Sequence, residues 1–274
     1  MGASFGASLL RVSAGGTRYA LKWAPGGAPA AMVAAEAHGL QALAATGTVR
    51  VPAIIAASNE AALPMPDHAL QPSFLLSTWL EGGGARPDQA RLGEELAALH
   101  RTTAPAFGLE RDNFIGGTPQ TNGWAPDWPT FFREQRLQPQ LALAEAGGLL
   151  SPVRRHTLER LLARLDALLA VPGAPSLIHG DLWGGNVVAG PGGAPALIDP
   201  AVSYSHREAE LAFTELFGGF SHRFYEAYNA AWPLDPGYAR RRPIYNLYHA
   251  LNHANLFGAG YLTMVDELLR EAPR

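Results

Sequence analysis

Two short segments hold the side chains best suited to chemistry. They span residues 179–186, with the sequence HGDLWGGN, and residues 198–200, with the sequence IDP. Asp181 has the carboxylate needed to accept a proton from a hydroxyl group. Asn186 and Asp199 supply oxygen ligands of the kind that Mg²⁺ prefers. Together they suit transfer of a phosphoryl group from ATP to a hydroxyl, a reaction that depends on positioning and charge neutralisation.

The spacing within these segments matches the catalytic loop of protein kinases. That loop has the pattern H-R-D-x-x-x-x-N, and His179, Asp181 and Asn186 keep its spacing, with Gly180 in place of the arginine. Asp199 stands where kinases have their metal-binding aspartate. The alternative is an ordinary β-hairpin with a polar loop, because H-x-D alone is common. The second aspartate, which follows a short apolar run, favours the kinase interpretation.

Flanking residues predict the elements that hold these groups in place. Residues 187–188 and 196–198 are apolar and are separated by the turn-forming segment 190–193, which predicts two short paired strands. Near the N-terminus, residues 8–23 predict a hairpin. The small residues of segment 2–8 would let backbone N–H groups approach the phosphates of a nucleotide.

Two charged residues complete the expected nucleotide site. Lys22 lies on the second strand of the N-terminal hairpin, where a kinase has the lysine that contacts the α- and β-phosphates. Residues 30–45 predict a helix whose only acid, Glu36, would pair with Lys22 and hold it over the nucleotide. The alternatives are a solvated lysine and an exposed helical charge.

The composition changes most sharply at the glycine run 82–84. We therefore predict a nucleotide-binding lobe over residues 1–81, a hinge over 82–88, and a helical lobe with the catalytic loop over 89–274. The expected fold class is α+β, with a small β-rich N-terminal lobe and a larger, mainly helical C-terminal lobe, as in protein kinases. Adenine would lie against the hinge. The backbone groups expected to bind it are those of Thr78, Trp79 and Leu80.

Periodicity and turn residues predict the remaining elements. The expected strands span residues 51–57 and 73–80. The expected helices span residues 88–101, 131–146, 152–170, 207–217, 223–231 and 238–257, with a short one after residue 260. Segment 107–129 is predicted to be a loop, and its two tryptophans argue against disorder.

Composition excludes several classes of protein. The chain has 274 residues, a formal net charge of −3 and no cysteine. The charge does not suggest a surface for nucleic acid or membranes, and the absence of cysteine excludes disulfides and thiolate catalysis. No apolar run approaches the ~18 residues of a membrane span, and no signal peptide is evident. We expect a cytoplasmic enzyme with no obligate protein partner.

Several segments go beyond a generic kinase. They are FGL at 107–109, DNFIG at 112–116, TPQTNGW at 118–124, WPTFF at 128–132, HGDLWGGN at 179–186, HREAEL at 206–211, LFGGF at 216–220 and LNH at 251–253. With these segments the chain resembles the fructosamine kinase, or ketosamine-3-kinase, family, which is related to the aminoglycoside phosphotransferases. Aminoglycoside and choline kinases share H-G-D-x-x-x-x-N but generally lack the T-P-Q-x-N-x-W and L-F-G-G-F segments.

The resemblance implies an ATP-dependent enzyme that phosphorylates the sugar 3-hydroxyl of ketosamines, either as small molecules or as adducts on proteins. A role in deglycation follows, because the 3-phosphate destabilises the adduct. The resemblance also implies that Asp181 accepts the proton, and that Asn186 and Asp199 bind Mg²⁺. Lys22 with Glu36 would bind the nucleotide.

Further residues are expected near the substrate. Trp183 would form a platform beside it, with core packing as the alternative. His249, Asn252 and His253 share one helix face by their spacing and could hydrogen-bond a polyol, with a buried polar cluster as the alternative. Of these three, Asn252 and His253 are predicted for the site. Glu210 is predicted to brace the catalytic loop.

Other hypotheses stay open. The family normally has a dozen or more residues before the point where this chain begins, so a truncated N-terminal lobe with an incomplete phosphate loop is one expectation. A kinase of an aminoglycoside or amino alcohol would need several carboxylates for a cationic substrate, and those near the catalytic segment are chiefly Glu208, Glu210 and Glu215. A nucleotide-binding pseudokinase is the third hypothesis, which the presence of Asp181 and Lys22 disfavours.

Overall fold

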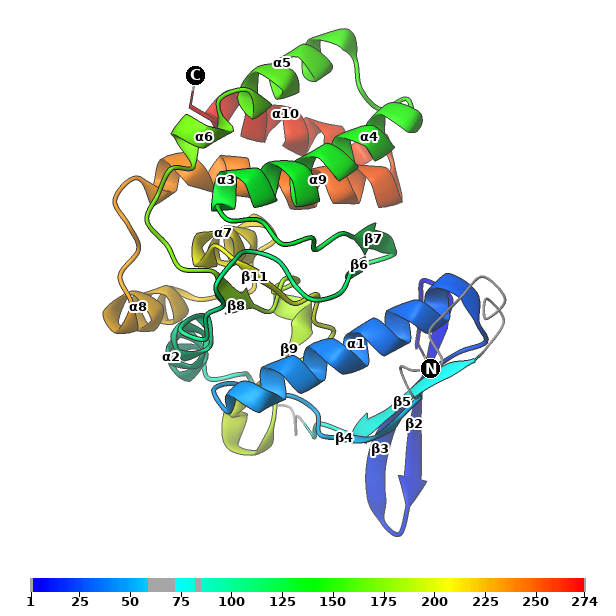
Figure 1. Cartoon of the computed structure of the whole chain (residues 1–274). Coiled ribbons are helices and arrows are strands. Elements are labelled where there is room, and N and C mark those ends of the chain that lie inside the picture. Colours follow the sequence, from blue (N-terminus) through cyan, green and yellow to red (C-terminus); the bar gives the residue numbers. More distant parts are fainter. Residues whose placement is uncertain (1, 59–71, 82–84, 274) are drawn as a thin grey trace.

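The structure, a computed structural model, describes residues 2–58, 72–81 and 85–273 (Figure 1). Among these residues, a five-stranded sheet and one long helix form the N-terminal part, and helices with short two-stranded sheets form the rest. The predicted α+β class, with a small β-rich part and a larger helical part, is confirmed. The predicted hinge lies in the interval between these parts, and residues 82–84 of it fall outside the described residues. The lobe boundaries stay a prediction.

The sheet has the strand order β1-β2-β3-β5-β4, and neighbouring strands are antiparallel. Its members are β1 (Gly2–Ser4), β2 (Ala7–Ala14), β3 (Thr17–Ala24), β4 (Ile54–Ala57) and β5 (Ser73–Thr78). The predicted hairpin is that of β2 and β3. Its turn contains Gly15 and Gly16, whose positive φ angles of 57° and 77° suit glycine. Lys22 lies opposite Leu75 in the register of β3 and β5.

Strand β1 was not predicted. It lies in the segment expected to form a phosphate loop, and the chain turns back into β2 at Phe5 and Gly6, with φ angles of 48° and 86°. The expected loop is therefore a tight turn between two strands. The Phe5 ring lies close to Gly117, where a built Cβ atom would be 2.6 Å from a ring carbon.

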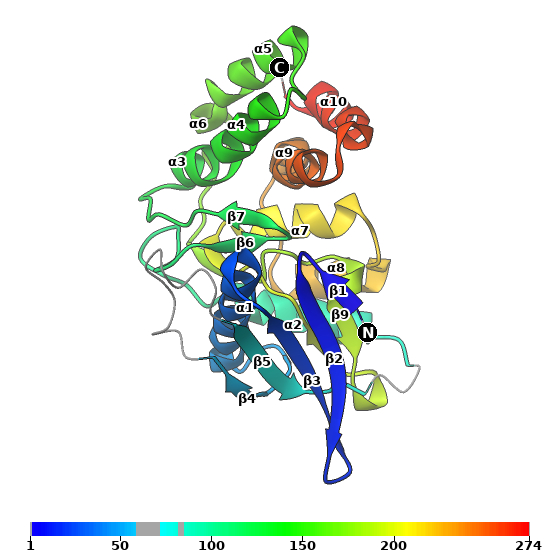
Figure 2. The same cartoon turned by 90° about the vertical axis from the view of Figure 1, so that its right-hand side faces the viewer.

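Helix α1 (Gly27–Thr46) crosses one face of the sheet (Figure 2). It ends at Gly47, whose left-handed conformation stops the helix. Several of its contact residues are small, so the helix lies close to the strands, and Glu36 comes within reach of Lys22. The buried residues that join helix and sheet are Ala7, Ala24, Ala30, Val33, Ala37, Leu40 and Leu75.

Most of the helical part lies above the sheet and α1 in Figure 1. Its α-helices are α2 (Gln89–His100), α3 (Trp128–Phe131), α4 (Gln138–Ala146), α5 (Pro152–Leu162), α6 (Leu165–Leu168), α7 (Arg207–Leu216), α8 (His222–Ala231), α9 (Tyr238–Phe257) and α10 (Leu262–Glu271). Asp88 caps α2, accepting hydrogen bonds from the backbone N–H groups of Ala90 and Arg91.

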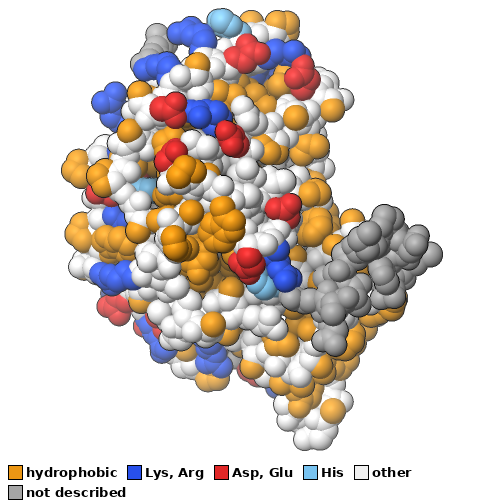
Figure 3. Space-filling view, in the orientation of Figure 1, with side chains coloured by type: hydrophobic (Ala, Val, Ile, Leu, Met, Phe, Trp, Pro, Cys, Tyr) orange, Lys and Arg blue, Asp and Glu red, His pale blue; other side chains and the backbone are white. Residues whose placement is uncertain are grey.

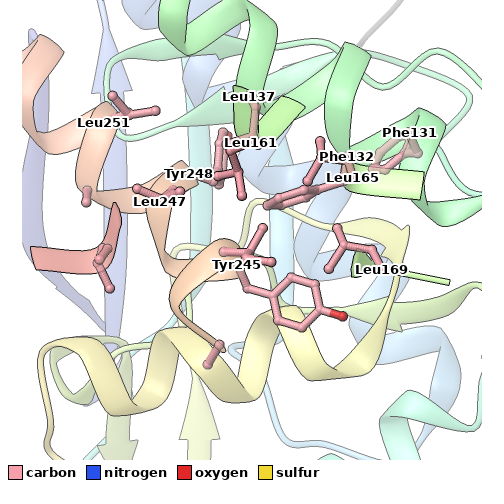
Figure 4. Close-up of a cluster of buried hydrophobic side chains, with 14 of the residues drawn as sticks. Phe131, Phe132, Leu137, Leu161, Leu165, Leu169, Tyr245, Leu247, Tyr248 and Leu251 are labelled. Atoms are coloured by element: carbon pink, nitrogen blue, oxygen red, sulfur yellow. The ribbon is translucent and has the colours of Figure 1, made fainter. Parts of the chain in front are cut away.

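Two predicted helices differ from the observed ones. The helix expected over 131–146 begins earlier and contains a π-helical turn, η3 (Phe132–Leu137), just before Pro139. The helix expected over 152–170 is broken, because the backbone tightens where the Arg164 N–H bonds to the Leu161 carbonyl three residues back. Leucines on both sides of the break are buried in the core. Figure 4 shows this core, with Phe131, Phe132, Leu165 and Tyr245 packed together.

Short antiparallel pairs connect the helices near the expected catalytic loop. They are β6 (Asn113–Ile115) with β7 (Thr118–Gln120), β8 (Ser176–Ile178) with β11 (Ser203–Ser205), and β9 (Val187–Ala189) with β10 (Pro195–Leu197). The pair β9–β10 is the hairpin predicted from the sequence. The pair β6–β7 lies in the segment predicted to be a loop.

The surface carries charges of both signs. On the face in Figure 3, acidic and basic side chains are interspersed among apolar ones. Within the described parts of the chain, every helix is too short or too polar to cross a lipid bilayer.

Candidate active site

Asp181 and Asn186 are brought together by one turn of 3-10 helix, η4 (Gly184–Asn186). The Asn186 side-chain amide donates to the Asp181 carbonyl at 2.8 Å and to its Oδ2 at 3.2 Å. Because the amide nitrogen is used in this way, the Asn186 Oδ1 stays available as a ligand atom. Burial, with Asp199 nearby, raises the pKa of Asp181 to about 7. A carboxylate with a raised pKa is a stronger base towards a hydroxyl proton.

Lys22 lies between two carboxylates. Its Nζ is 2.5 Å from Glu36 Oε2 and 2.8 Å from Asp199 Oδ1. The ion pair predicted between Lys22 and Glu36 is therefore present. Burial disfavours the ammonium charge, but the attraction of Glu36 and Asp199 outweighs it and raises the pKa of Lys22. Likewise, burial would raise the pKa of Asp199, but Lys22 outweighs this and lowers it. Both groups keep their charges.

His179 joins the two catalytic segments. Its Nε2 donates to the Ile198 carbonyl at 2.9 Å, and its Nδ1 accepts the backbone N–H of Asp181 at 3.3 Å. Burial lowers the pKa of His179, which keeps the ring neutral. His179 thus fixes Asp181 relative to Asp199 without adding charge.

Glu210, in the first turn of α7, braces the same loop. Its carboxylate accepts the backbone N–H of His179 at 3.0 Å and that of Gly180 at 2.6 Å. The His100 Nε2 donates to it at 2.9 Å. Burial alone would raise the pKa of Glu210, but the hydrogen bonds and the His100 ring outweigh burial and lower it. The predicted brace is a buried, charged hydrogen-bond acceptor.

Two cavities meet at Lys22, Glu36 and Asp199. The larger has a volume of about 530 Å³, contains Asp181 and Asn186 in its wall, and extends to α9. The smaller has a volume of about 190 Å³ and lies under the sheet. The residues predicted for adenine line this smaller cavity: Thr78, Trp79 and Leu80.

The residues predicted for the substrate line the larger cavity. Trp183 is 44% exposed there. The Asn252 amide is already bonded, accepting from Gln140 at 3.3 Å and donating to the Ile115 carbonyl at 3.4 Å. The His253 Nδ1 donates to the carbonyl of the preceding helical turn at 2.8 Å, so its Nε2 is the nitrogen left for a ligand. Their roles in binding stay predictions.

This geometry agrees with the family comparison. A model of the fructosamine kinase family matches residues 7–273. The chain belongs to the fructosamine kinase family. The family predicted from the sequence is confirmed, and with it the prediction of a phosphotransferase that acts on a hydroxyl group.

Relatives in this family share most of the chain. A probable ketoamine kinase of Synechocystis sp. is 44% identical over 89% of this chain and 79% of its own length. The chloroplastic protein-ribulosamine 3-kinase of Arabidopsis thaliana is 40% identical over 88% of this chain and 73% of its own. The crystal structure of a candidate fructosamine-3-kinase from Thermobifida fusca aligns with a TM-score of 0.86 at 36% identity, covering 99% of this chain and 91% of that one. An aminoglycoside phosphotransferase aligns with a TM-score of 0.60 at 15% identity, over 97% and 94% of the two chains, which shows the shared fold.

The T-P-Q-x-N segment of this family member supports the wall of the larger cavity. Gln120 accepts the Tyr248 hydroxyl at 2.5 Å and donates to Asn113 at 2.7 Å and to the Ala201 carbonyl at 3.3 Å. The segment thus ties α9 to the residues that follow Asp199. Sequence patterns marked this segment but did not show its partners.

Arg136 completes that buried network. It donates to the Asn122 side chain at 2.7 Å and to the Ser203 hydroxyl at 3.1 Å. Burial lowers the pKa of Arg136 to about 10, which leaves it charged at neutral pH. A buried charge with its donors satisfied fixes one arrangement of the surrounding loops.

The glycines of the W-G-G-N segment hold Trp183 in place. A Cβ atom on Gly185 would lie 2.3 Å from the Trp183 ring, so this ring lies directly over the Gly185 backbone. A Cβ atom on Gly219 would lie 2.8 Å from the Gly184 Cα, so the L-F-G-G-F segment packs against this loop. Glycines are needed at both contacts.

We expect Gly185→Ala to displace the Trp183 ring and raise the KM for the phosphate acceptor roughly tenfold or more, since small misplacements at a site are costly. The ring is partly exposed and can move aside, so the unfolding temperature should change little. Steady-state kinetics with a thermal melt tests both points. An unchanged acceptor KM would remove Trp183 from the substrate platform.

Proposed function

We propose that this chain transfers the γ-phosphoryl group of ATP to the 3-hydroxyl of ketosamines, with Mg²⁺ as cofactor. The observation that carries the proposal is the meeting of the two cavities at Lys22, Glu36 and Asp199, with Asp181 in the wall of the larger. A nucleotide in the smaller cavity would present its phosphates to Lys22 and its terminal phosphate to an acceptor beside Asp181. The ketoamine and ribulosamine kinases among its relatives support the substrate class. The cytoplasmic location expected from the sequence stays a prediction.

Asp181 would act as the proton acceptor. As the 3-oxygen of the sugar forms its bond to the γ-phosphorus, the bond from that phosphorus to the β,γ-bridging oxygen breaks, and ADP leaves with the bonding electron pair. The hydroxyl proton passes to Asp181. Lys22 offsets the charge that develops on the nucleotide phosphates.

The residues present suit Mg²⁺. The Asn186 Oδ1 is left available by the bonds of its amide nitrogen, and Asp199 presents a carboxylate whose lowered pKa keeps it ionised. These are the hard oxygen donors that Mg²⁺ takes, with phosphates and waters as its other ligands. The bound metal would neutralise phosphate charge.

A cationic aminoglycoside fits this site less well, because the three acids considered for it are already paired. Glu208 accepts two hydrogen bonds from Arg241, at 2.6 and 2.7 Å. Glu215 accepts the Tyr238 hydroxyl at 2.6 Å and an Arg242 N–H at 2.5 Å.

We expect Asp199→Asn to fold normally and to lose Mg²⁺-dependent nucleotide affinity. Asp199 has a φ of 54°, a conformation that Asn also tolerates. The wild type should bind ATP at least about tenfold more tightly with Mg²⁺ than with EDTA, the effect of one lost charge contact in a phosphate site, and the variant should lose this difference. Isothermal titration calorimetry measures it. A variant that keeps the wild-type ratio would show that Asp199 is not a metal ligand.

The direct test of the function is ADP release with Mg·ATP and a panel of acceptors. The panel contains a fructose–lysine adduct, a ribulose–lysine adduct, an aminoglycoside and choline. We expect turnover of the ketosamines alone. Turnover of the aminoglycoside or choline alone would refute the proposal, and bound ATP without turnover of any acceptor would favour a pseudokinase.

A further inference from the structure

Four neighbouring aromatic side chains line part of the larger cavity. The His253 ring lies 4.6 Å from that of Phe217, 5.6 Å from Phe257 and 5.2 Å from Tyr261, measured between centroids, and Phe257 lies 6.0 Å from Tyr261. All four line the cavity. We call Phe217, His253, Phe257 and Tyr261 the aromatic cluster of the cavity.

Two helix C-termini meet at this place. Helix α7 ends at Leu216, directly before Phe217, and α9 ends at Phe257. After Gly258, whose φ is 91°, the chain turns back so that Tyr261 faces the last turn of α9. Helix C-termini carry partial negative charge and favour cations nearby.

The aromatic cluster leaves large apolar side chains exposed to solvent, which is unfavourable in free energy. Phe257 is 56% exposed and Phe217 is 37% exposed. Large apolar side chains that gather and stay exposed in a cavity mark a candidate ligand-binding surface. These exposed rings therefore give the larger cavity an apolar subsite.

The acidic side chains that line the cavity lie outside the aromatic cluster. Among the residues that the structure describes, the acids that line the cavity are Glu36, Asp181 and Asp199, and Glu36 and Asp199 are paired with Lys22. None of these three acids belongs to the aromatic cluster. His253 adds no positive charge there, because burial lowers its pKa, and its Nδ1 proton is bonded to the helix backbone.

We propose that the aromatic cluster binds the alkylammonium group of the ketosamine, that is, the protonated amine together with the carbon chain attached to it. This inference rests on the proposed function. Ring faces attract a cation without a carboxylate, and they bury the carbon chain at the same time.

The test uses two probes, a ketosamine of butylamine and its N-acetyl form, in which the nitrogen is a neutral amide. We expect the wild type to prefer the charged probe. Phe257→Leu and Tyr261→Leu, measured separately, keep apolar area but remove an aromatic face. Each should raise the KM for the charged probe about tenfold with kcat kept, and leave the KM for the acetylated probe unchanged. Phe74→Leu, a comparably exposed aromatic residue on β5 that does not line the cavity, is the matched control and should change neither KM.

The outcomes separate this inference from the function on which it rests. If the wild type turns over the ketosamine and both variants keep its preference for the charged probe, the aromatic subsite is overturned and the proposed function stands. A wild type that does not distinguish the probes also overturns it alone, because the charge is then not recognised. A wild type that phosphorylates no ketosamine overturns both.

Discussion

Asp181→Asn should lower turnover of the phosphate acceptor by about 10²–10⁴-fold, the usual contribution of a general base. The substitution keeps the size of the side chain and an oxygen that can accept from Asn186. Asp181 lines the larger cavity and not the smaller one, so the affinity for Mg·ATP should stay close to that of the wild type. Initial rates of ADP release and calorimetric titration with Mg·ATP measure the two quantities.

A matched control for this variant is Asp166→Asn. Asp166 is an exposed aspartate paired with Arg133 and lines neither cavity, so its loss should leave turnover unchanged. If Asp181→Asn retained near-normal turnover, the proton would have to leave by another route. If both ATP affinity and turnover collapsed, Asp181 would be a structural residue of the loop.

Gly180→Ala should lower the free energy of unfolding by roughly 3 kcal/mol or more and abolish activity. Gly180 has a φ of 85°, where an L side chain is strained, and a Cβ atom would lie 2.0 Å from the Ala201 carbonyl oxygen. This neighbour is backbone and cannot rotate away. Moving the Gly180 backbone away would also break the bond from the Gly180 N–H to Glu210.

Gly148→Ala is a control that separates the strain of a positive φ angle from the steric clash expected at position 180. Gly148 has a similar positive φ of 68°, but its Cβ atom would meet nothing within 4 Å. This control should lose only about 1–2 kcal/mol, the cost of the left-handed conformation, and should keep its activity. Chemical denaturation of both variants gives the comparison. Equal losses would show that the contact with Ala201 does not determine the residue at position 180.

The sequence determined the chemistry of the catalytic loop and the fold class. Asp181 and Asn186 lie five positions apart in a glycine-containing loop, so their proximity follows from a single helical turn. The hairpin that carries Lys22 and the helix that carries Glu36 were also predictable, because alternation, turn glycines and apolar periodicity are local properties.

Local sequence did not determine where helices kink or break. Leucine periodicity predicted one helix over 152–170, yet the backbone tightens at Arg164 and continues as α6. Strands β6 and β7, which are three residues each, were not distinguishable from a loop. Elements this short are stabilised by tertiary contacts, here the hydrogen bond from Tyr248 of α9 to Gln120 of β7, and not by their own propensity.

Only the tertiary structure decided which charges remain free for a ligand. Lys22 meets Asp199 across 177 positions, and Glu208 is neutralised by Arg241 across 33. The aromatic cluster likewise combines residues from the end of α7, the end of α9 and the turn after α9. Sequence patterns report the spacing of residues within one element. Which elements lie against each other depends on packing of the whole chain, because buried charges and exposed rings find their partners only when distant segments come together.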